Sequence, residues 1–214
     1  MAHKRLIILT LVGISIGLGI TLSIYKFQEP KGIVYKETTA EDVLNKNQKI
    51  GGDFSLIDHH GKLVSTSEYR GKILLIYFGY TYCPDVCPMA LEHITKALKM
   101  LGKDRDKIGV FFISVDPTRD TCEILKLYST NFDPNIVMLT GSEEALQDAM
   151  SKYKIYAKKE IKEGFSDYLI DHTSVVYVVG PDGAYVTNFA HSTVPEKIKT
   201  ILLNQLKTLL KTNH

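Results

Sequence analysis

The chain has 214 residues, 44% of them hydrophobic, which is enough for one sizeable core or for a membrane segment followed by one domain. It carries 26 basic and 24 acidic side chains, and no block of Lys and Arg is interleaved with aromatic residues, so no nucleic-acid partner is expected. Its three cysteines are an odd number, which excludes a fully paired disulfide framework.

The first apolar segment is residues 6–25, LIILTLVGISIGLGITLSIY, which contains no charged residue. As a helix it is long enough to cross the hydrocarbon core of a bilayer, roughly 30 Å. Lys4 and Arg5 precede it, so the positive-inside rule keeps residues 1–5 in the cytoplasm and puts the rest of the chain outside. We therefore predict a transmembrane anchor. The alternatives are a signal peptide, for which Thr21-Leu22-Ser23 is a poor cleavage site, and a buried core helix.

The position of this segment also predicts a compartment. An anchor that begins at residue 6 leaves no room for an organelle presequence, so we expect a single-pass protein of a bacterial inner membrane, with its domain in the periplasm. Residues 26–50 are polar and contain Pro30 and Gly32, which is typical of a linker. The folded domain is then predicted to span residues 51–214.

The first half of this domain shows strand and helix patterns in alternation. Residues 54–58 and 63–67 flank a turn that contains Gly61, which predicts a hairpin. The apolar run 73–78 predicts a strand buried on both faces, and the apolar spacing after Val86 predicts a helix that ends at Gly102. Further elements of the same two types are predicted at 108–115 (strand), about 120–132 (helix), 136–139 (strand) and from Glu143 onward (helix).

The second half changes to a hairpin and a final helix. Residues 174–179 and 184–189 predict two strands joined by Gly180-Pro-Asp-Gly183, and Pro195 suits the first turn of an amphipathic helix. Alternating strands and helices followed by a hairpin indicate an α/β domain, with a mixed central sheet and helices on both sides. This is the layout of a thioredoxin-like fold.

Two cysteines lie in the stretch YFGYTYCPDVCPM, residues 77–89. Cys83 is predicted in the turn after a buried strand and Cys87 in the first turn of the next helix, at the carboxyl end of the sheet, where open α/β folds bind ligands. The positive end of the helix dipole stabilises a thiolate there, and Asp85 is expected to cap the helix. Pro-flanked cysteines in a turn fill a core poorly, so two inert buried thiols are the least favoured interpretation.

Both redox and metal chemistry use such a thiolate pair. Dithiol oxidoreductases typically have two residues between the cysteines, whereas this pair has three. Two thiolates and one imidazole make a site that suits Cu(I), while structural zinc normally takes four ligands and no second cysteine pair exists here. Cys122 is interpreted as a free residue in the first turn of a helix, with a redox partner as the alternative.

A third ligand would have to be one of the seven histidines. His172 comes just before the predicted strand 174–179, where Asp171 and His172 point to opposite faces; this makes it a candidate, but the pattern alone leaves the assignment open. The others are predicted to lie near a chain end, in an exposed turn, away from Cys87 on the helix, or in a solvated stretch: His3, His214, His59, His60, His93 and His191.

Three motifs in order resemble the Sco/SenC family of membrane-anchored copper proteins. They are YFGYTYCPDVCP (77–88), SVDPTRDT (114–121) and DHT (171–173) with PDG (181–183). The resemblance covers about residues 51–210 and implies a thioredoxin-like fold and a role in assembling the copper centre of cytochrome c oxidase. Carried over by motif, Cys83, Cys87 and His172 match the family's two thiolate ligands and its histidine ligand. Tyr82 and Cys122 depart from the usual pattern, but neither is part of the metal motif.

The resemblance implies a metallochaperone that receives and hands on copper without catalytic turnover. Its expected partner is the copper-receiving subunit of cytochrome c oxidase, and the copper donor is not indicated. The alternative is a membrane-tethered thiol-disulfide oxidoreductase that uses Cys83 and Cys87 as a redox-active disulfide and acts on cysteines of an oxidase subunit. Enzymes of this fold that act on disulfides or peroxides carry a cis-proline near the position of Ser174, so Ser174 disfavours this alternative and a peroxide-reducing enzyme.

Overall fold

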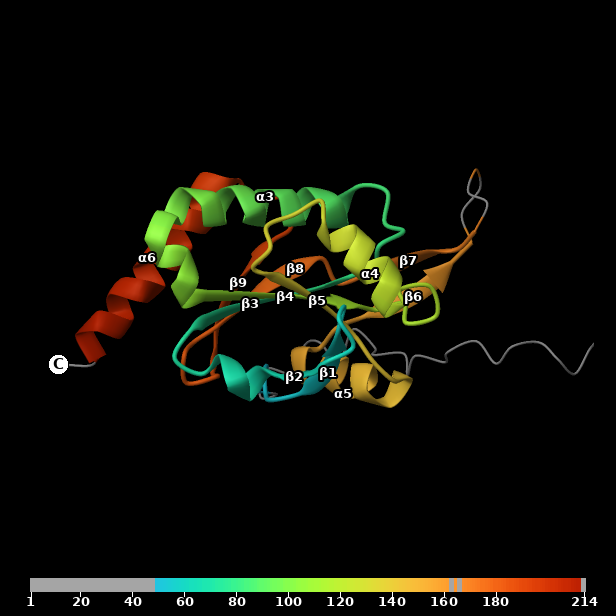
Figure 1. The fold of residues 1–214 in the computed structure, drawn as a ribbon, viewed down its shortest axis with the longest axis horizontal. Coiled ribbons are helices and arrows are strands. Elements are labelled where there is room, and N and C mark those ends of the chain that lie inside the picture. The colour runs from blue at the N-terminus through green and yellow to red at the C-terminus, as the bar shows by residue number, and fades with distance from the viewer. Residues whose placement is uncertain (1–48, 162–163, 165–166, 213–214) are drawn as a thin grey trace, which may run out of the picture. The chain divides into compact units, whose positions relative to one another are not determined.

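The longest apolar runs of the sequence form the centre of a seven-stranded sheet in the computed structural model (Figure 1). β3 (Ile73–Gly79) and β4 (Ile108–Ser114) are buried at every position and pair in parallel, with Tyr77 opposite Phe112. β5 (Ile136–Thr140) pairs in parallel with β4. Strands without polar alternation need cover on both faces, and the helices on the two sides of this sheet provide it.

Antiparallel strands complete both edges of the sheet. The hairpin of β1 (Ser55–Asp58) and β2 (Leu63–Ser65) pairs with β5, and β8 (Val175–Val179) and β9 (Tyr185–Ala190) extend the sheet beyond β3. The resulting strand order is β2-β1-β5-β4-β3-β8-β9. Because β8 runs antiparallel to β3, the chain enters β8 at the end of the sheet where β3 finishes.

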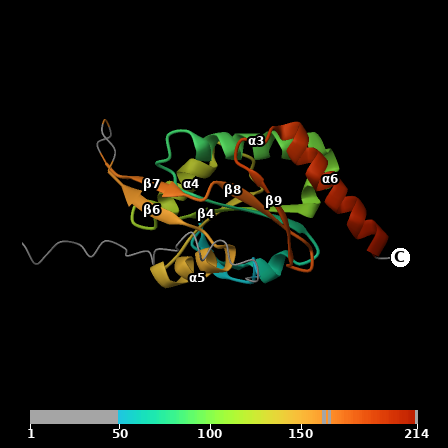
Figure 2. The ribbon, with the colours of Figure 1, turned by 180° about the vertical axis from the view of Figure 1, so that it is seen from behind.

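Helices cover the two faces of the sheet. Helices α3 (Val86–Leu101), α4 (Cys122–Ser129) and α6 (Pro195–Thr212) lie on one face and α5 (Glu143–Tyr153) on the other (Figures 1 and 2). Two short 3-10 helices, η1 (Thr66–Tyr69) and η2 (Gly102–Lys107), precede β3 and β4. The predicted α/β class, with a mixed sheet flanked by helices, is therefore confirmed.

A second sheet was not predicted. β6 (Ala157–Glu160) and β7 (Leu169–His172) form a two-stranded antiparallel hairpin, with Ala157 opposite His172. His172 therefore ends β7 instead of leading directly into the strand 174–179, and β8 begins at Val175. The exposed lysines of β6 hid this strand, since Ala-Lys-Lys-Glu has neither an apolar run nor a clear alternation of polar and apolar residues.

The structure describes residues 49–161, 164 and 167–212, without the side chains of 209–212. The predicted anchor at residues 6–25 and most of the linker at 26–50 lie outside these ranges, so both stay predictions. Among the helices of the described ranges, none combines the length and the apolar character that crossing a bilayer requires.

Candidate metal centre

The cysteine loop (residues 80–85) joins the buried end of β3 to helix α3. Tyr80 is buried, and its carbonyl accepts a hydrogen bond of 3.3 Å from the backbone N–H of Cys83. Asp85 occupies the N-cap position of α3, but its side chain makes no capping hydrogen bond. The prediction that the Asp85 carboxylate caps this helix is therefore wrong. The sulfur of Cys83 instead accepts from the backbone N–H groups of Asp85 and Cys87, which brings a thiolate to the positive end of the helix.

Cys87 lies in the first turn of α3 and is fully buried, with its Sγ atom close to Gly79 of β3. The hydroxyl of Tyr77 donates to its Sγ atom at 3.6 Å. Gly79 makes this close packing possible, because a Cβ atom at that position would lie 2.8 Å from Cys87 Sγ and 2.7 Å from Cε2 of Phe112. The glycine of the motif is thus required for space, since its own backbone needs no left-handed conformation.

The hairpin β6–β7 brings His172 to the two sulfurs. Its Nε2 atom lies 3.4 Å from Sγ of Cys87, and its ring packs edge-on against Tyr80 at 5.7 Å between centroids. Its Nδ1 atom lies 3.1 Å from the carbonyl oxygen of Thr173. Since a carbonyl can only accept, Nδ1 carries the proton and the lone pair of Nε2 faces the sulfurs. This tautomer leaves Nε2 available to bind a metal ion.

The three donor atoms form one compact cluster. The Sγ atoms of Cys83 and Cys87 and a ring nitrogen of His172 all lie within 4.8 Å of one another, and no other group of three or more such residues occurs in the described ranges. A surface hollow of about 210 Å³ opens beside Cys83 and His172. Because Cys83 is 8% exposed and Cys87 is fully buried, an ion or a partner reaches Cys83 and His172 first.

The two thiols are electrostatically unequal. The hydrogen bond from the Cys87 thiol is the largest cause that lowers the pKa of Cys83, and the backbone N–H groups of Asp85 and Cys87 lower it further, so its pKa is lowered despite its burial. Burial, followed by the neighbouring Cys83, raises the pKa of Cys87. Between these two pKa values the pair holds one thiolate, on Cys83, and one thiol, on Cys87.

A buried carboxylate outside the cluster fixes the start of the cysteine loop. Asp120 accepts hydrogen bonds from the Thr81 backbone N–H at 3.0 Å, from its hydroxyl at 2.6 Å and from the Ser114 hydroxyl at 2.6 Å. Sequence reasoning assigned no role to Asp120, Tyr77 or Tyr80. Their only signals were the motifs themselves: Tyr77 and Tyr80 lie in the motif 77–88, and Asp120 lies in the motif 114–121, whose polar residues follow a buried strand.

The remaining histidines lie apart from the cluster as far as the structure describes them. His93 contacts the carbonyl of Thr193, so the prediction that it points away from Cys87 is confirmed. His60 is exposed, but His59 is half-buried with Nδ1 3.3 Å from the Met138 carbonyl, and the half-buried His191 contacts the Ser174 carbonyl. The predictions of an exposed His59 and a solvated His191 are therefore wrong. His3 and His214 lie outside the described residues.

The third cysteine is separate from the pair. Cys122 is the first residue of α4, is half-buried, and donates its thiol to the Asp58 carbonyl at 3.4 Å. The prediction of a free, partly buried residue in the first turn of a helix is confirmed. The neighbour of His172, Asp171, is exposed.

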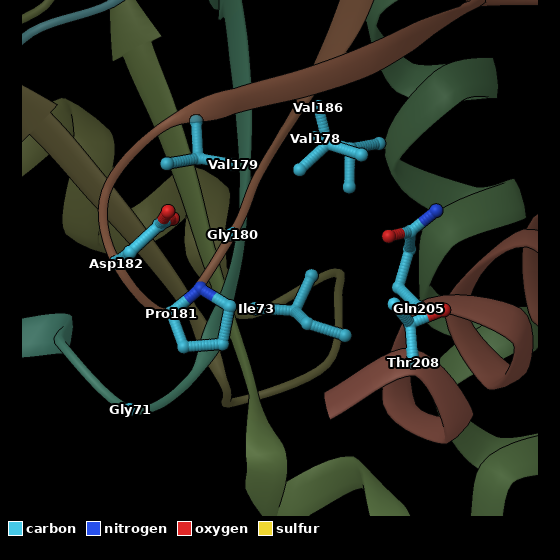
Figure 3. A pocket seen from close by; sticks show the side chains of 10 residues that line it. All are labelled: Gly71, Ile73, Val178, Val179, Gly180, Pro181, Asp182, Val186, Gln205 and Thr208. Atoms are coloured by element: carbon cyan, nitrogen blue, oxygen red, sulfur yellow. The ribbon is translucent and has the colours of Figure 1, made fainter. Parts of the chain in front are cut away.

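A larger cavity of about 630 Å³ lies at the opposite end of β3 (Figure 3). It opens between the β8–β9 turn and helix α6, and its lining contains no cysteine or histidine. The lining residues are Gly71, Ile73, Val178, Val179, Gly180, Pro181, Asp182, Val186, Gln205 and Thr208. Because it offers no soft donor, this cavity does not compete with the sulfur cluster as a metal site.

The donor set fits copper best among the common metals. Two sulfurs and one imidazole are soft or borderline ligands, which favour Cu(I) and tolerate three-coordination. Zinc in a structural site takes four protein ligands, and the cluster offers three. Fully oxidised, the same two sulfurs would form a disulfide and would no longer bind metal.

Comparison with known proteins gives a consistent assignment. The family model SCO1/SenC matches residues 42–207. The SCO2-like protein of Rickettsia conorii is 33% identical over 199 residues, which cover 92% of this chain and 96% of that protein. The copper-bound structure of Bradyrhizobium japonicum ScoI is 42% identical, with a TM-score of 0.68 over 73% of this chain and 99% of that one.

A third similar protein is BsSco, described as a Sco-family cytochrome c oxidase assembly protein with a disulfide switch. Its structure is 26% identical, with a TM-score of 0.57 over 74% of this chain and 94% of that one. Since the family model covers well over half of the chain, these matches agree with the site geometry and with the motifs around it. The chain belongs to the SCO1/SenC family.

Proposed function

We propose that this protein is a copper-binding assembly factor that holds one Cu(I) ion between Cys83, Cys87 and His172 and passes it on. The observation that carries the proposal is the convergence of two sulfurs and one ring nitrogen within 4.8 Å, from the cysteine loop, helix α3 and strand β7, at a hollow open to solvent. The copper-bound ScoI structure supports the choice of metal. Copper is here a cargo, so no catalytic turnover is required.

The unequal thiols suggest an order of loading. The Cys83 thiolate and the Nε2 lone pair of His172 lie at the opening and offer two donors without losing a proton. Cys87 then releases its proton to solvent as its sulfur binds the ion, so one proton leaves for each Cu(I) bound. The ion exchanges its previous ligands for these three donors, and no electron is transferred.

For the recipient we propose the copper-receiving subunit of cytochrome c oxidase. BsSco is described as an oxidase assembly protein, and the hollow beside Cys83 gives an incoming ligand access to the ion without unfolding. We further propose that residues 6–25 anchor the chain in a bacterial inner membrane and that the copper-binding domain faces the periplasm. The absence of charged residues in 6–25 supports the anchor, and Lys4 and Arg5 before it support this orientation, because positive charges stay on the cytoplasmic side.

Anaerobic Cu(I) titration in competition with a chromophoric chelator tests the site. The reduced protein should bind one Cu(I), and Cys83→Ser and Cys87→Ser should each lose tight binding. Cys122→Ser is the matched control, because this thiol is half-buried on α4 outside the cluster. Unchanged affinity in either variant of the pair, or a loss in the control, would contradict the proposal.

A second candidate is a thiol-disulfide oxidoreductase acting on oxidase cysteines. It is favoured by the closeness of the two sulfurs and by the disulfide switch described for BsSco. This activity needs the two sulfurs but not His172. Turnover on a disulfide substrate, with and without His172→Ala, separates the candidates: fast turnover that does not depend on His172 supports the oxidoreductase, whereas slow or absent turnover supports the copper carrier.

A further inference from the structure

The loop between β4 and α4 contacts both the cysteine loop and the segment that leads into β7, the strand that carries His172. This bridging loop (residues 116–120) has the sequence Asp-Pro-Thr-Arg-Asp and belongs to the motif 114–121. None of its residues is among the three metal donors. Toward the cysteines, Asp120 accepts two hydrogen bonds from Thr81, and the Ser114 hydroxyl donates a third to the same carboxylate. The cysteine loop is therefore fixed to the bridging loop at its first residues.

Toward the histidine, Arg119 of the same loop binds the residue that precedes β7. Its Nη1 donates to the carbonyl of Tyr168 at 2.9 Å, and its guanidinium stacks on the Tyr168 ring, with Cζ 3.6 Å from the ring centroid. The Tyr168 hydroxyl donates a hydrogen bond of 2.8 Å to the carboxylate of Asp116, which also lies in the bridging loop. Tyr168 leads directly into β7, whose last residue is His172, so these contacts hold the strand that carries the third donor.

Arg119 is largely buried, so its ion pair with Asp116 is not a surface ion pair. Its side chain is 18% exposed and its partner Asp116, bound through Nε at 2.5 Å, is fully buried. Tyr80 and Tyr82 of the cysteine loop face the same guanidinium, at 5.9 and 4.8 Å. The Nη2 atom has no hydrogen-bond partner, and these aromatic faces stabilise the cation around it.

Tyr80 connects the cysteine loop directly to β7. Its hydroxyl accepts the backbone N–H of Ile170 in β7 at 3.1 Å, and its ring packs against His172. Arg119 therefore lies where the bridging loop, the cysteine loop and β7 meet, and Figure 1 shows α4, which follows the bridging loop, beside the β6–β7 hairpin.

We infer that Arg119 is a positioning residue for the metal centre: it holds β7 against the cysteine loop, so that Nε2 of His172 stays within reach of the ion bound by the two sulfurs. This inference rests on the proposed copper function. Without the planar, stacked guanidinium, β7 loses its carbonyl contact and its stacking, and the centre becomes a site of two sulfurs with a loosely held imidazole.

The test is a double-mutant cycle between Arg119 and His172 in the full-length chain. Arg119→Lys keeps the charge beside Asp116 but removes the stacking and the planar fork. The matched control is Arg105→Lys, because Arg105 is 29% exposed and binds the buried Asp133 at 2.8 Å but lies in η2, which precedes β4 at the opposite end of the sheet.

We expect Arg119→Lys to weaken Cu(I) binding about tenfold or more, as loss of an outer contact to a ligand commonly does, and Arg105→Lys to leave it unchanged. In the His172→Ala background, Arg119→Lys should cause no further loss. X-ray absorption of the Cu(I)-loaded Arg119→Lys variant should show the nitrogen ligand reduced or lost and both sulfurs retained.

Two results would overturn the inference alone: wild-type affinity in Arg119→Lys, or an equal loss in the presence and in the absence of His172, which would mean that Arg119 acts on the whole fold or on the sulfurs. If His172→Ala itself bound copper like the wild type, the three-donor site would fail and this inference with it. Should Arg119→Lys not fold, Tyr168→Phe, which removes only the hydroxyl bond to Asp116, enters the same cycle with the same expected signs.

Discussion

The Nε2 atom of His172 lies 3.4 Å from the Sγ atom of Cys87, although 85 positions separate these residues along the chain. One donor ends a strand of the small hairpin and the other begins the helix after β3. The antiparallel entry of β8 beside β3, with Val176 opposite Tyr77, brings these two segments to the same sheet edge. The complete donor set therefore exists only in the folded chain, which couples metal binding to folding.

Copper should consequently stabilise the fold. Because the unfolded chain offers the three donors no fixed geometry, Cu(I) at about a thousandfold excess over its dissociation constant should raise the free energy of unfolding by about 4 kcal/mol. Anaerobic thermal denaturation with and without Cu(I) measures the gain. It should be much smaller in His172→Ala at the same copper concentration. An unchanged melting temperature in the wild-type protein would contradict the coupling.

Removal of the Tyr77 hydroxyl should weaken the site without disturbing the core. Tyr77→Phe removes the donor to Cys87 Sγ, which contributes about 1 kcal/mol, so Cu(I) affinity should fall about fivefold. Tyr177→Phe is the control, because Tyr177 is also buried but packs against Tyr153 of α5, on the other face of the sheet. Equal affinities in both variants would show that the Tyr77 hydroxyl does not act on the sulfur.

Gly79→Ala should damage the centre through crowding. The added methyl group would lie 2.8 Å from Cys87 Sγ and 2.7 Å from the Phe112 ring, and such overpacking costs about 1–3 kcal/mol. Urea denaturation should show this loss, together with weaker Cu(I) binding. Gly141→Ala is the milder comparison, because its methyl group would meet the end of the Leu56 side chain at 3.0 Å. Equal stability of Gly79→Ala and the wild type would refute the close packing.

The two thiols should react at different pH values in the metal-free protein. The hydrogen bonds to Cys83 lower its pKa, so its thiolate is already formed below the ordinary thiol pKa of 9.0, whereas burial raises the pKa of Cys87 above it. Iodoacetamide at neutral pH should label Cys83 well before Cys87, and the rate should fall only when the pH drops below the lowered pKa of Cys83. Peptide mass spectrometry of the time course measures both sites; preferential labelling of Cys87 would contradict this assignment.

Periodicity predicted the main sheet because its signals are local. The uniformly apolar runs of β3, β4 and β8 and the turn residues Gly180 and Gly183 determine burial and reversal within a few positions. β6 and β7 escaped detection because each has four residues and β6 carries two lysines. Their pairing is a tertiary event, and neither strand has a sufficient pattern of its own.

The same distinction between local and tertiary features applies to the residues of the site. Cys83 and Cys87 could be found from their place after a buried strand, since the turn and the helix start are local features. The position of His172 depends on the pairing of β7 with β6, so residue patterns left it open and the family resemblance supplied it. The contacts of Arg119 and Tyr80 could not be predicted, because they join three segments that are distant in sequence.

The measurement that tests the central claim most directly is X-ray absorption at the copper edge of the Cu(I)-loaded, full-length protein, compared with that of His172→Ala. We predict two sulfur ligands and one nitrogen ligand in the wild type and loss of the nitrogen in the variant, with a much lower Cu(I) affinity. Two sulfurs and no nitrogen in the wild type, or identical spectra and affinities for the two proteins, would contradict it.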